Sequence, residues 1–108
     1  MKYLGSVKFG DVNIKVLSNS DALTVAELHF PAGATADIHH HINEEVNYVV
    51  KGVFETFDKN QVLILNPGDT VQVLSNSKHN LKCVSHEDGV ILTAWSPSRK
   101  DIMNKITP

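Results

Sequence analysis

The sequence predicts an all-β protein, an antiparallel barrel or sandwich, because short apolar segments alternate with turn signals along most of the chain. The turns recur about every ten residues and are rich in Gly, Pro, Asn and Asp, which favour tight turns. Helical periodicity is almost absent. The 108 residues suffice for one compact core and are too few for two. We therefore expect a single domain, residues 1–108, with about eight or nine short strands.

The expected strands follow one another in the order of the apolar runs. Residues 12–17 begin as strict alternation after the turn signal Gly10-Asp11, and residues 24–30 place alternate apolar side chains on one face until Pro31 and Gly33 end the run. Further strands are expected at residues 46–50, 53–57, 62–65, 71–74, 80–84 and 90–95. The turns between them include 51–52, 58–60 and the tetrad Asn66-Pro67-Gly68-Asp69.

Two features refine this fold prediction. Residues 62–65 and 90–92 are apolar on both faces, as expected where one face packs inside and the other meets a second sheet or a partner subunit. Residues 99–106 are the exception to the strand pattern, because Ile102, Met103 and Ile106 would share one face of a short helix. Such a helix would pack on the rim of the barrel.

Composition excludes several classes of function. The net charge is −2 and Lys and Arg form no block, so we expect no nucleic-acid partner. Cys83 is the one cysteine, which excludes an internal disulfide framework. No signal-peptide pattern stands at the N-terminus and no apolar run approaches the roughly 18 residues of a membrane span. We expect a cytoplasmic protein without a membrane partner.

Four residues form the pattern of a metal site: His39, His41, Glu45 and His79. The first two are two positions apart, so in an extended strand their side chains point the same way with Cα atoms roughly 6.6 Å apart. Glu45 follows after a short turn, and His79 comes from a later strand. Imidazoles with one carboxylate suit iron, nickel, manganese, zinc, cobalt or copper better than magnesium or calcium. We expect one divalent transition-metal ion per chain.

Neighbouring residues compete for these roles. Glu44 is the alternative carboxylate, but its parity directs it to the opposite face from Glu45. His40 points away from its neighbours and is expected at the surface or at a subunit contact. His29 and His86 belong to no motif and are expected on the surface or the rim. Cys83 is expected to fill the core, with contact to the cavity as the alternative.

The spacing of these residues resembles the two motifs of the cupin family. Gly33-x5-His39-x-His41-x3-Glu45-x6-Gly52 matches the first motif at every position, and Gly68-x5-Leu74-x-Asn76-x2-His79-x3-Cys83 resembles the second. In the second motif Leu74, Asn76 and Cys83 replace the usual proline, glycine and asparagine. The resemblance implies a double-stranded β-helix, or jelly-roll barrel, with a core at about residues 22–99.

The C-terminal segment resembles small bacterial cupins that linearise unsaturated uronates released from pectin or alginate. In that group an aromatic residue and an arginine flank a Ser-Pro pair, and they correspond to Trp95 and Arg99. The resemblance implies an apolar wall at Trp95 and a bidentate clamp for a sugar carboxylate at Arg99. The alternative is structural: Trp95 fills the barrel and Arg99 pairs with Asp101 or a backbone carbonyl. Thr93 stands where the group has its acid/base aspartate.

Three functional classes follow from these residues. The first is a metal-dependent enzyme acting on a small carboxylate-bearing sugar or carbonyl compound, by isomerisation or ring opening. The second is a dioxygenase, because three histidines and one glutamate are also the metal ligands of oxygen-using cupins. Glu45 stands where the uronate-opening group usually has a glutamine. The third is a non-catalytic ligand-binding or sensory cupin, which the absence of an aspartate at Thr93 favours. We also expect a homodimer, formed by pairing sheets or by exchange of residues 2–9.

Overall fold

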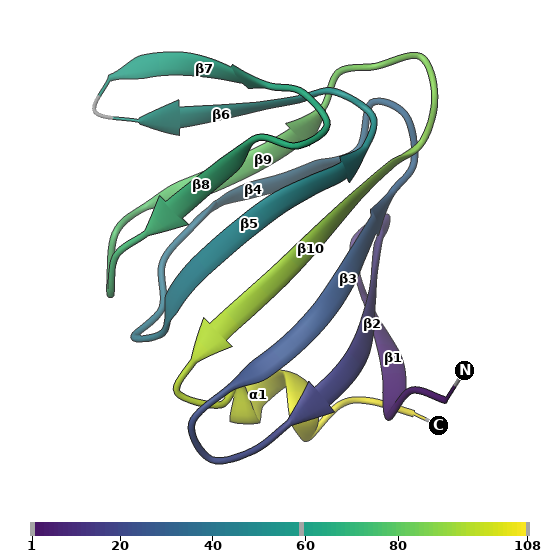
Figure 1. Ribbon diagram of the computed structural model, residues 1–108, viewed down its shortest axis with the longest axis vertical. Helices are drawn as coiled ribbons and strands as arrows, with labels where there is room; N and C mark the ends of the chain where they lie inside the picture. The colour runs from purple at the N-terminus through teal and green to yellow at the C-terminus, as the bar shows by residue number, and fades with distance from the viewer. Residues whose placement is uncertain (1, 59, 108) are drawn as a thin grey trace.

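The computed structural model describes residues 2–58 and 60–107, and these residues form ten strands and one short helix (Figure 1). The all-β prediction is confirmed. The expected turn at 58–60 includes Lys59, which lies outside the described residues. The elements are β1 (Gly5–Phe9), β2 (Val12–Asn19), β3 (Thr24–Phe30), β4 (Thr35–His39), β5 (Glu44–Lys51), β6 (Phe54–Asp58), β7 (Gln61–Leu65), β8 (Thr70–Val73), β9 (His79–Cys83), β10 (Gly89–Ser96) and α1 (Lys100–Met103).

The strands form two antiparallel sheets that face each other as the walls of a barrel (Figure 1). The larger sheet has the order β1-β2-β3-β10-β5-β8, and the smaller has the order β4-β9-β6-β7. Consecutive strands therefore repeatedly change sheet, and the last strand, β10, lies between β3 and β5. This is the double-stranded β-helix implied by the family resemblance.

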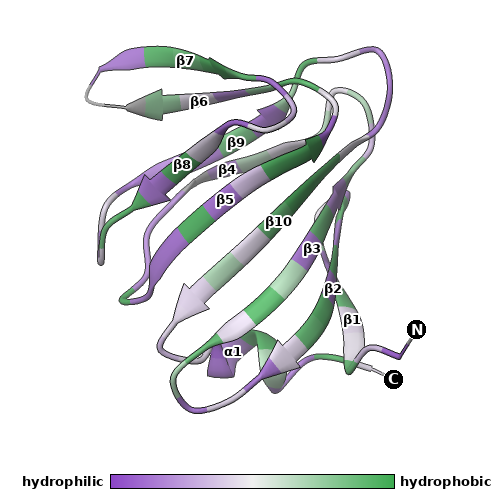
Figure 2. Cartoon of the chain, in the orientation of Figure 1, coloured by the Kyte–Doolittle hydropathy of each residue, from purple (hydrophilic) through white to green (hydrophobic). Residues whose placement is uncertain are grey.

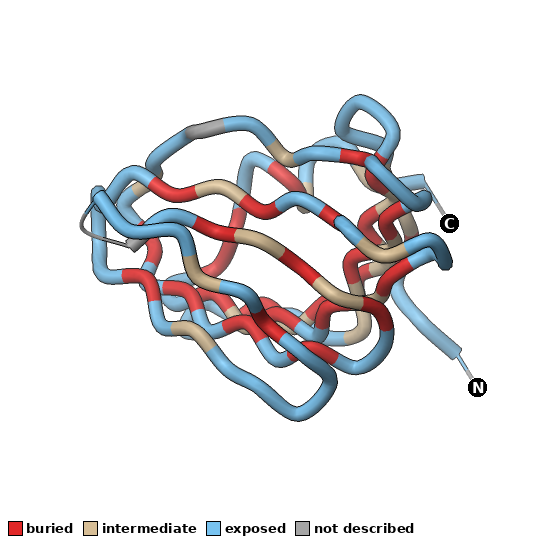
Figure 3. Tube along the Cα trace, turned by 90° about the horizontal axis from the view of Figure 1, so that it is seen from above, coloured by how far each residue is buried: buried red, intermediate tan, exposed pale blue. Residues whose placement is uncertain are grey.

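The apolar core lies between the sheets and extends from Phe30 and Phe54 to Trp95 and Ile102. Hydrophobic and polar side chains alternate along the strands (Figure 2), and buried positions alternate with exposed ones (Figure 3). Phe30 of the larger sheet and Phe54 of the smaller meet edge to face, with ring centroids 5.0 Å apart. A Cβ at Gly89 would lie 2.5 Å from Cζ of Phe54, so no larger residue fits there without a shift of the ring. Apolar contacts therefore close the end of the barrel at which Phe30 and Phe54 meet.

Three elements differ from the sequence-based expectation. The strand β4 was not predicted as a separate apolar run, because Thr35, Asp37 and His39 make it largely polar. The predicted helix at 99–106 is reduced to Lys100–Met103, since Thr107 pairs with Ser6 of β1 and draws the last residues into an extended conformation. Beyond the strands expected from the apolar runs, residues Gly5–Phe9 form β1, which pairs with β2. No helix in the described part of the chain is long and apolar enough to cross a membrane.

Candidate metal centre

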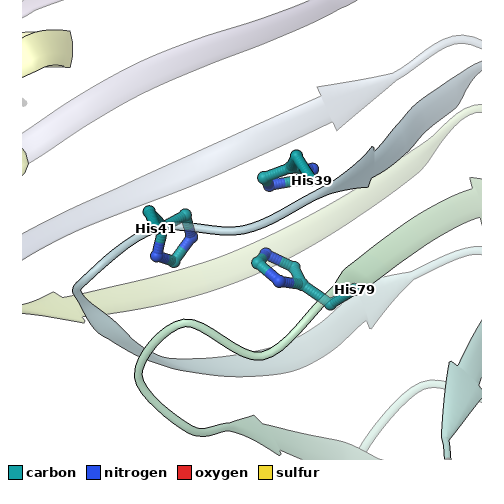
Figure 4. Close-up of side chains that lie close together, drawn as sticks. All are labelled: His39, His41 and His79. Carbon is teal, nitrogen blue, oxygen red and sulfur yellow. The ribbon is translucent and has the colours of Figure 1, made fainter.

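Three histidine side chains meet at the end of the barrel opposite the Phe30–Phe54 pair (Figure 4). His39 ends β4, His79 begins β9, and His41 lies in the connection after β4. One ring nitrogen from each lies within 4.8 Å of the other two. The expectation that His39 and His41 share one extended strand is therefore wrong in detail, because β4 ends before His41. The chain turns there toward β5, and the two rings still converge.

Backbone carbonyls fix the tautomer of all three rings. The Nδ1 atoms of His39, His41 and His79 lie 2.7, 3.0 and 2.9 Å from the carbonyl oxygens of Asp37, Asn43 and Ser77. A carbonyl can only accept, so each Nδ1 carries a hydrogen and each Nε2 faces the centre, where a neutral ring presents a lone pair to a metal ion. This is the arrangement by which proteins orient histidine ligands of a metal ion.

Glu45 adds a buried carboxylate to the same point. It lies at the start of β5, is 4% exposed, and its Oε1 is 3.1 Å from Nε2 of His41 and 3.5 Å from Nε2 of His79. Burial raises the pKa of Glu45, but the contacts with His41, His79 and Asn47 outweigh it and hold the pKa well below its usual range. The side chain is therefore an anion at neutral pH.

The donor atoms of this cluster fit a transition-metal ion. In the part of the chain that the structure describes, Nε2 of His79 is a buried side-chain atom without a hydrogen-bond partner. Nitrogen lone pairs and a carboxylate oxygen that face one another with little water between them repel unless a proton or a cation lies between them. Burial lowers the pKa of His39, which favours its neutral, ligating form, whereas at His79 the contact with Glu45 outweighs burial and raises the pKa. The histidine–glutamate cluster (His39, His41, Glu45 and His79) is thus positioned to hold a metal ion.

A buried chain of hydrogen bonds reaches the second carboxylate oxygen of Glu45, Oε2. Nδ2 of Asn47 donates to Oε2 of Glu45 at 2.7 Å, and the Thr93 hydroxyl donates to Oδ1 of Asn47 at 2.8 Å. Both polar side chains are at most 1% exposed, and β5 and β10 place them directly opposite each other. The carboxylate of Glu45 can only accept, so it determines which way the Asn47 amide faces, and Thr93 donates to the amide oxygen that remains. Its hydroxyl is engaged in this contact.

Trp95 and Arg99 lie on the other side of Glu45. Nε1 of Trp95 donates to Oε1 of Glu45, and the guanidinium of Arg99 stacks 4.8 Å from the centroid of the Trp95 ring. Nε and NH2 of Arg99 donate to the two carboxylate oxygens of Asp101 at 3.0 and 2.9 Å. The edge of the guanidinium formed by Nε and NH2 is thus occupied within the chain.

The ion pair gives a pH-dependent prediction. The hydrogen bonds from Arg99 hold the pKa of Asp101 below its usual value of about 3.9. Because the folded-state pKa is depressed, the stabilisation is present above about pH 4 and is lost as pH falls through the lowered pKa. Asp101 is 59% exposed, so Asp101→Asn should cost no more than about 1 kcal/mol at about pH 7. Thermal denaturation of the two metal-free proteins should converge at about pH 2, and a difference that persisted there would contradict the ion-pair origin.

Sequence reasoning missed one residue that supports the site. Asn43 is 5% exposed, and its side-chain Nδ2 donates to the backbone carbonyl oxygens of Pro97 and Ser98. The backbone carbonyl of Asn43 accepts a hydrogen bond from Nδ1 of His41. Asn43 therefore ties the connection that carries a histidine to the C-terminal segment that carries Arg99. An asparagine before a strand indicates only a turn in the sequence, so no local signal could have found this contact.

The competing residues lie outside the cluster. Glu44 is exposed on the opposite face from Glu45, as its parity predicts, and His40 and His86 are exposed. His29 pairs with Glu27 on β3, 3.1 Å away. Cys83 is fully buried in the apolar core.

Comparisons with known proteins agree with the fold. A family model described as a cupin domain matches residues 26–95. The chain is 33% identical over 99 residues to the pectin degradation protein KdgF of Dickeya dadantii, covering 89% of this chain and 88% of that protein. An RmlC-like cupin from Shewanella frigidimarina superposes with a TM-score of 0.84 at 25% identity, covering 93% of this chain and 88% of the other. KdgF from Halomonas superposes with a TM-score of 0.82 at 23% identity, covering 89% and 88%. The chain therefore belongs to the cupin family.

Proposed function

We propose that this protein is a metal-dependent enzyme that isomerises or opens the ring of a small carboxylate-bearing sugar or carbonyl compound. The observation that carries the proposal is the convergence of three oriented Nε2 atoms and one buried carboxylate on a single point. The relationship to a pectin degradation protein supports a substrate of the uronate type. We expect one divalent transition-metal ion per chain, iron, nickel, manganese, zinc, cobalt or copper, and a cytoplasmic location.

The histidine–glutamate cluster would hold this ion. Once bound, such an ion supplies Lewis acidity that polarises a carbonyl or hydroxyl oxygen of the substrate. Ring opening of an unsaturated uronate is an isomerisation. The bond between the ring oxygen and the anomeric carbon breaks, that carbon becomes an aldehyde, and the ring oxygen becomes a ketone oxygen. The anomeric hydroxyl loses its proton, and the carbon of the double bond that does not carry the ring oxygen gains one.

The chain's own residues prepare the site for this chemistry. In the proposal, Trp95 forms an apolar wall and excludes water behind Glu45, and Arg99 keeps the indole in place through its stacking contact. Thr93 supports Asn47 by a hydrogen bond to its amide oxygen, and Asn47 in turn holds the carboxylate of Glu45. A threonine hydroxyl cannot act as a carboxylate base, so position 93 contributes orientation in this protein.

Glu45 favours a second candidate, an oxygen-using dioxygenase. A carboxylate beside three neutral imidazoles lowers the net charge of a divalent ion from +2 to +1, which favours oxidation chemistry over simple polarisation. Position 93, where the uronate-opening cupins have an aspartate, also favours a third reading, a ligand-binding or sensory cupin.

One experiment separates the three. Protein loaded with each metal in turn is mixed with an unsaturated uronate, and ultraviolet absorbance of the ring double bond is followed together with oxygen consumption. Loss of absorbance without oxygen consumption supports ring opening. Oxygen consumption that depends on a substrate supports the dioxygenase. Tight binding of the acid without either change supports the sensory function and contradicts the enzyme proposal.

We also propose that two chains form a homodimer through the outer face of the larger sheet. Val46, Tyr48 and Val50 of β5 and Leu92 of β10 are adjacent there and are 37–50% exposed. An apolar patch of this kind is typical of a subunit contact. Light scattering at micromolar concentration should give twice the mass of one chain. Tyr48→Glu should give a monomer, whereas Ile64→Lys on the outer face of the smaller sheet should remain a dimer; a monomeric wild type would refute the proposal.

A further inference from the structure

A cavity of about 490 Å³ lies at the end of the barrel that holds the metal centre. Its volume is in the range of pockets that bind small organic molecules. His79 belongs both to the cavity wall and to the histidine–glutamate cluster, so the cavity adjoins the candidate metal centre. The other lining residues come from β6, β8 and the connection between β8 and β9: Thr56, Phe57, Val71, Gln72, Val73, Leu74, Ser77 and Lys78.

The charges around this cavity favour an anion. Among the described residues that line the cavity, Lys78 is the one with a permanent charge. It forms no ion pair with any side chain that the structure describes. A divalent ion held by three neutral imidazoles and one carboxylate would leave a net charge of +1 beside it. The cavity therefore has two sources of positive charge, the ammonium group of Lys78 and the ion that the cluster beside His79 would hold.

Arg99 is a poorer candidate for binding an anion. It is 10% exposed on its side chain, and its Nε and NH2 atoms are bound to the carboxylate of Asp101. Arg99 is also absent from the residues that line the cavity, so a carboxylate in this cavity meets Lys78 rather than Arg99. Lys78 is exposed and directly precedes a metal-site histidine, so it reaches a ligand in the cavity without breaking an internal contact.

We propose that Lys78 receives the carboxylate of the ligand, while another oxygen of the same ligand faces the metal centre. The half-exposed side chains of Phe57 and Leu74 pack against its carbon skeleton. The ligand class is a small organic acid of sugar size, and this inference rests on the proposed function. It assigns to Lys78 the recognition that the family resemblance implies for Arg99.

The test uses two sugars that share a ring. Metal-loaded protein is titrated by calorimetry with D-galacturonate and with D-galactose, which carries a hydroxymethyl group in place of the carboxylate. The wild type should bind the acid more tightly, and added salt should reduce this preference. Lys78→Gln should weaken binding of the acid about fivefold and leave the neutral sugar unchanged. Lys82→Gln, which removes an exposed lysine of β9 that is absent from the cavity lining, is the matched control and should bind like the wild type.

Asp101→Asn discriminates between the two cations, because it releases the fork of Arg99. An unchanged affinity for galacturonate in this variant supports Lys78, and a gain that Arg99→Gln abolishes overturns the proposal in favour of Arg99. Equal binding of the acid by the wild type and Lys78→Gln, or no binding by the wild type at millimolar concentration, also overturns it. Turnover of an unsaturated uronate is measured in parallel. If the wild type turns over the uronate and Lys78→Gln does so with the same KM, the role of Lys78 is contradicted but the proposed function stands. If the wild type neither binds metal nor turns over the uronate, the proposed function itself is contradicted.

Discussion

A double variant, His39→Ala with His41→Ala, should contain almost no metal, whereas the wild type purified without chelator should contain about one transition-metal ion per chain. Two of the three oriented imidazoles are removed, and the ring of His79 with the Glu45 carboxylate cannot hold the ion alone. Elemental analysis measures the difference directly. The expected change is close to complete, because each lost ligand removes a direct bond to the ion.

The matched control is His40→Ala. This residue lies between the two ligands in the chain, is exposed and contributes no atom to the cluster, so its removal should leave the metal content unchanged. Thermal stability gives a second measurement. Metal added at about 100 times its dissociation constant should stabilise the wild type by about 2.7 kcal/mol and leave the double variant unaffected. Equal metal content in the wild type and the double variant would contradict the assignment.

The residues of the histidine–glutamate cluster could be predicted from the sequence because most of them depend on short-range spacing. His39, His41 and Glu45 lie within seven consecutive residues, and the parity of a strand separates Glu45 from Glu44 without reference to distant parts of the chain. His79 required the family motif, since nothing local places β9 beside β4. The core strands were equally predictable from their apolar alternation.

The surroundings of the site depend on contacts that are distant in the sequence. The contact of Asn43 with Pro97 spans 54 residues, and the one between Asn47 and Thr93 spans 46. Both follow from the register in which β5 pairs with β10, which the pattern of apolar residues does not specify to one residue. For the same reason the sequence left two alternatives for Arg99, a clamp for a ligand carboxylate or an internal ion pair. The stacking of Arg99 on Trp95 depends on the fold of the chain and could not be predicted.

Glu45→Gln is expected to weaken metal binding by about two orders of magnitude while the fold survives. The substitution removes the anionic ligand, and about 3 kcal/mol of lost attraction corresponds to about 100-fold in affinity. The amide nitrogen of glutamine cannot accept a hydrogen bond, so either Trp95 or Asn47 loses its acceptor. Reorientation of the Asn47 amide relieves this conflict, because the hydroxyl of Thr93 can accept as well as donate. The stability cost in the metal-free protein should therefore stay near 1 kcal/mol.

Glu44→Gln makes the same chemical change one residue earlier, on an exposed side chain of the opposite face, and should leave both quantities as in the wild type. Metal affinity is measured by competition with a chelator, and stability by thermal denaturation of the metal-free proteins. The comparison also tests the function, since the uronate-opening cupins that this chain resembles carry a glutamine-type ligand. If the carboxylate serves oxygen chemistry, Glu45→Gln should abolish oxygen consumption; if the protein opens uronate rings, the variant saturated with metal should retain that activity. Identical metal affinities in Glu44→Gln and Glu45→Gln would show that the buried carboxylate is no ligand, and the cluster would then reduce to its three histidines.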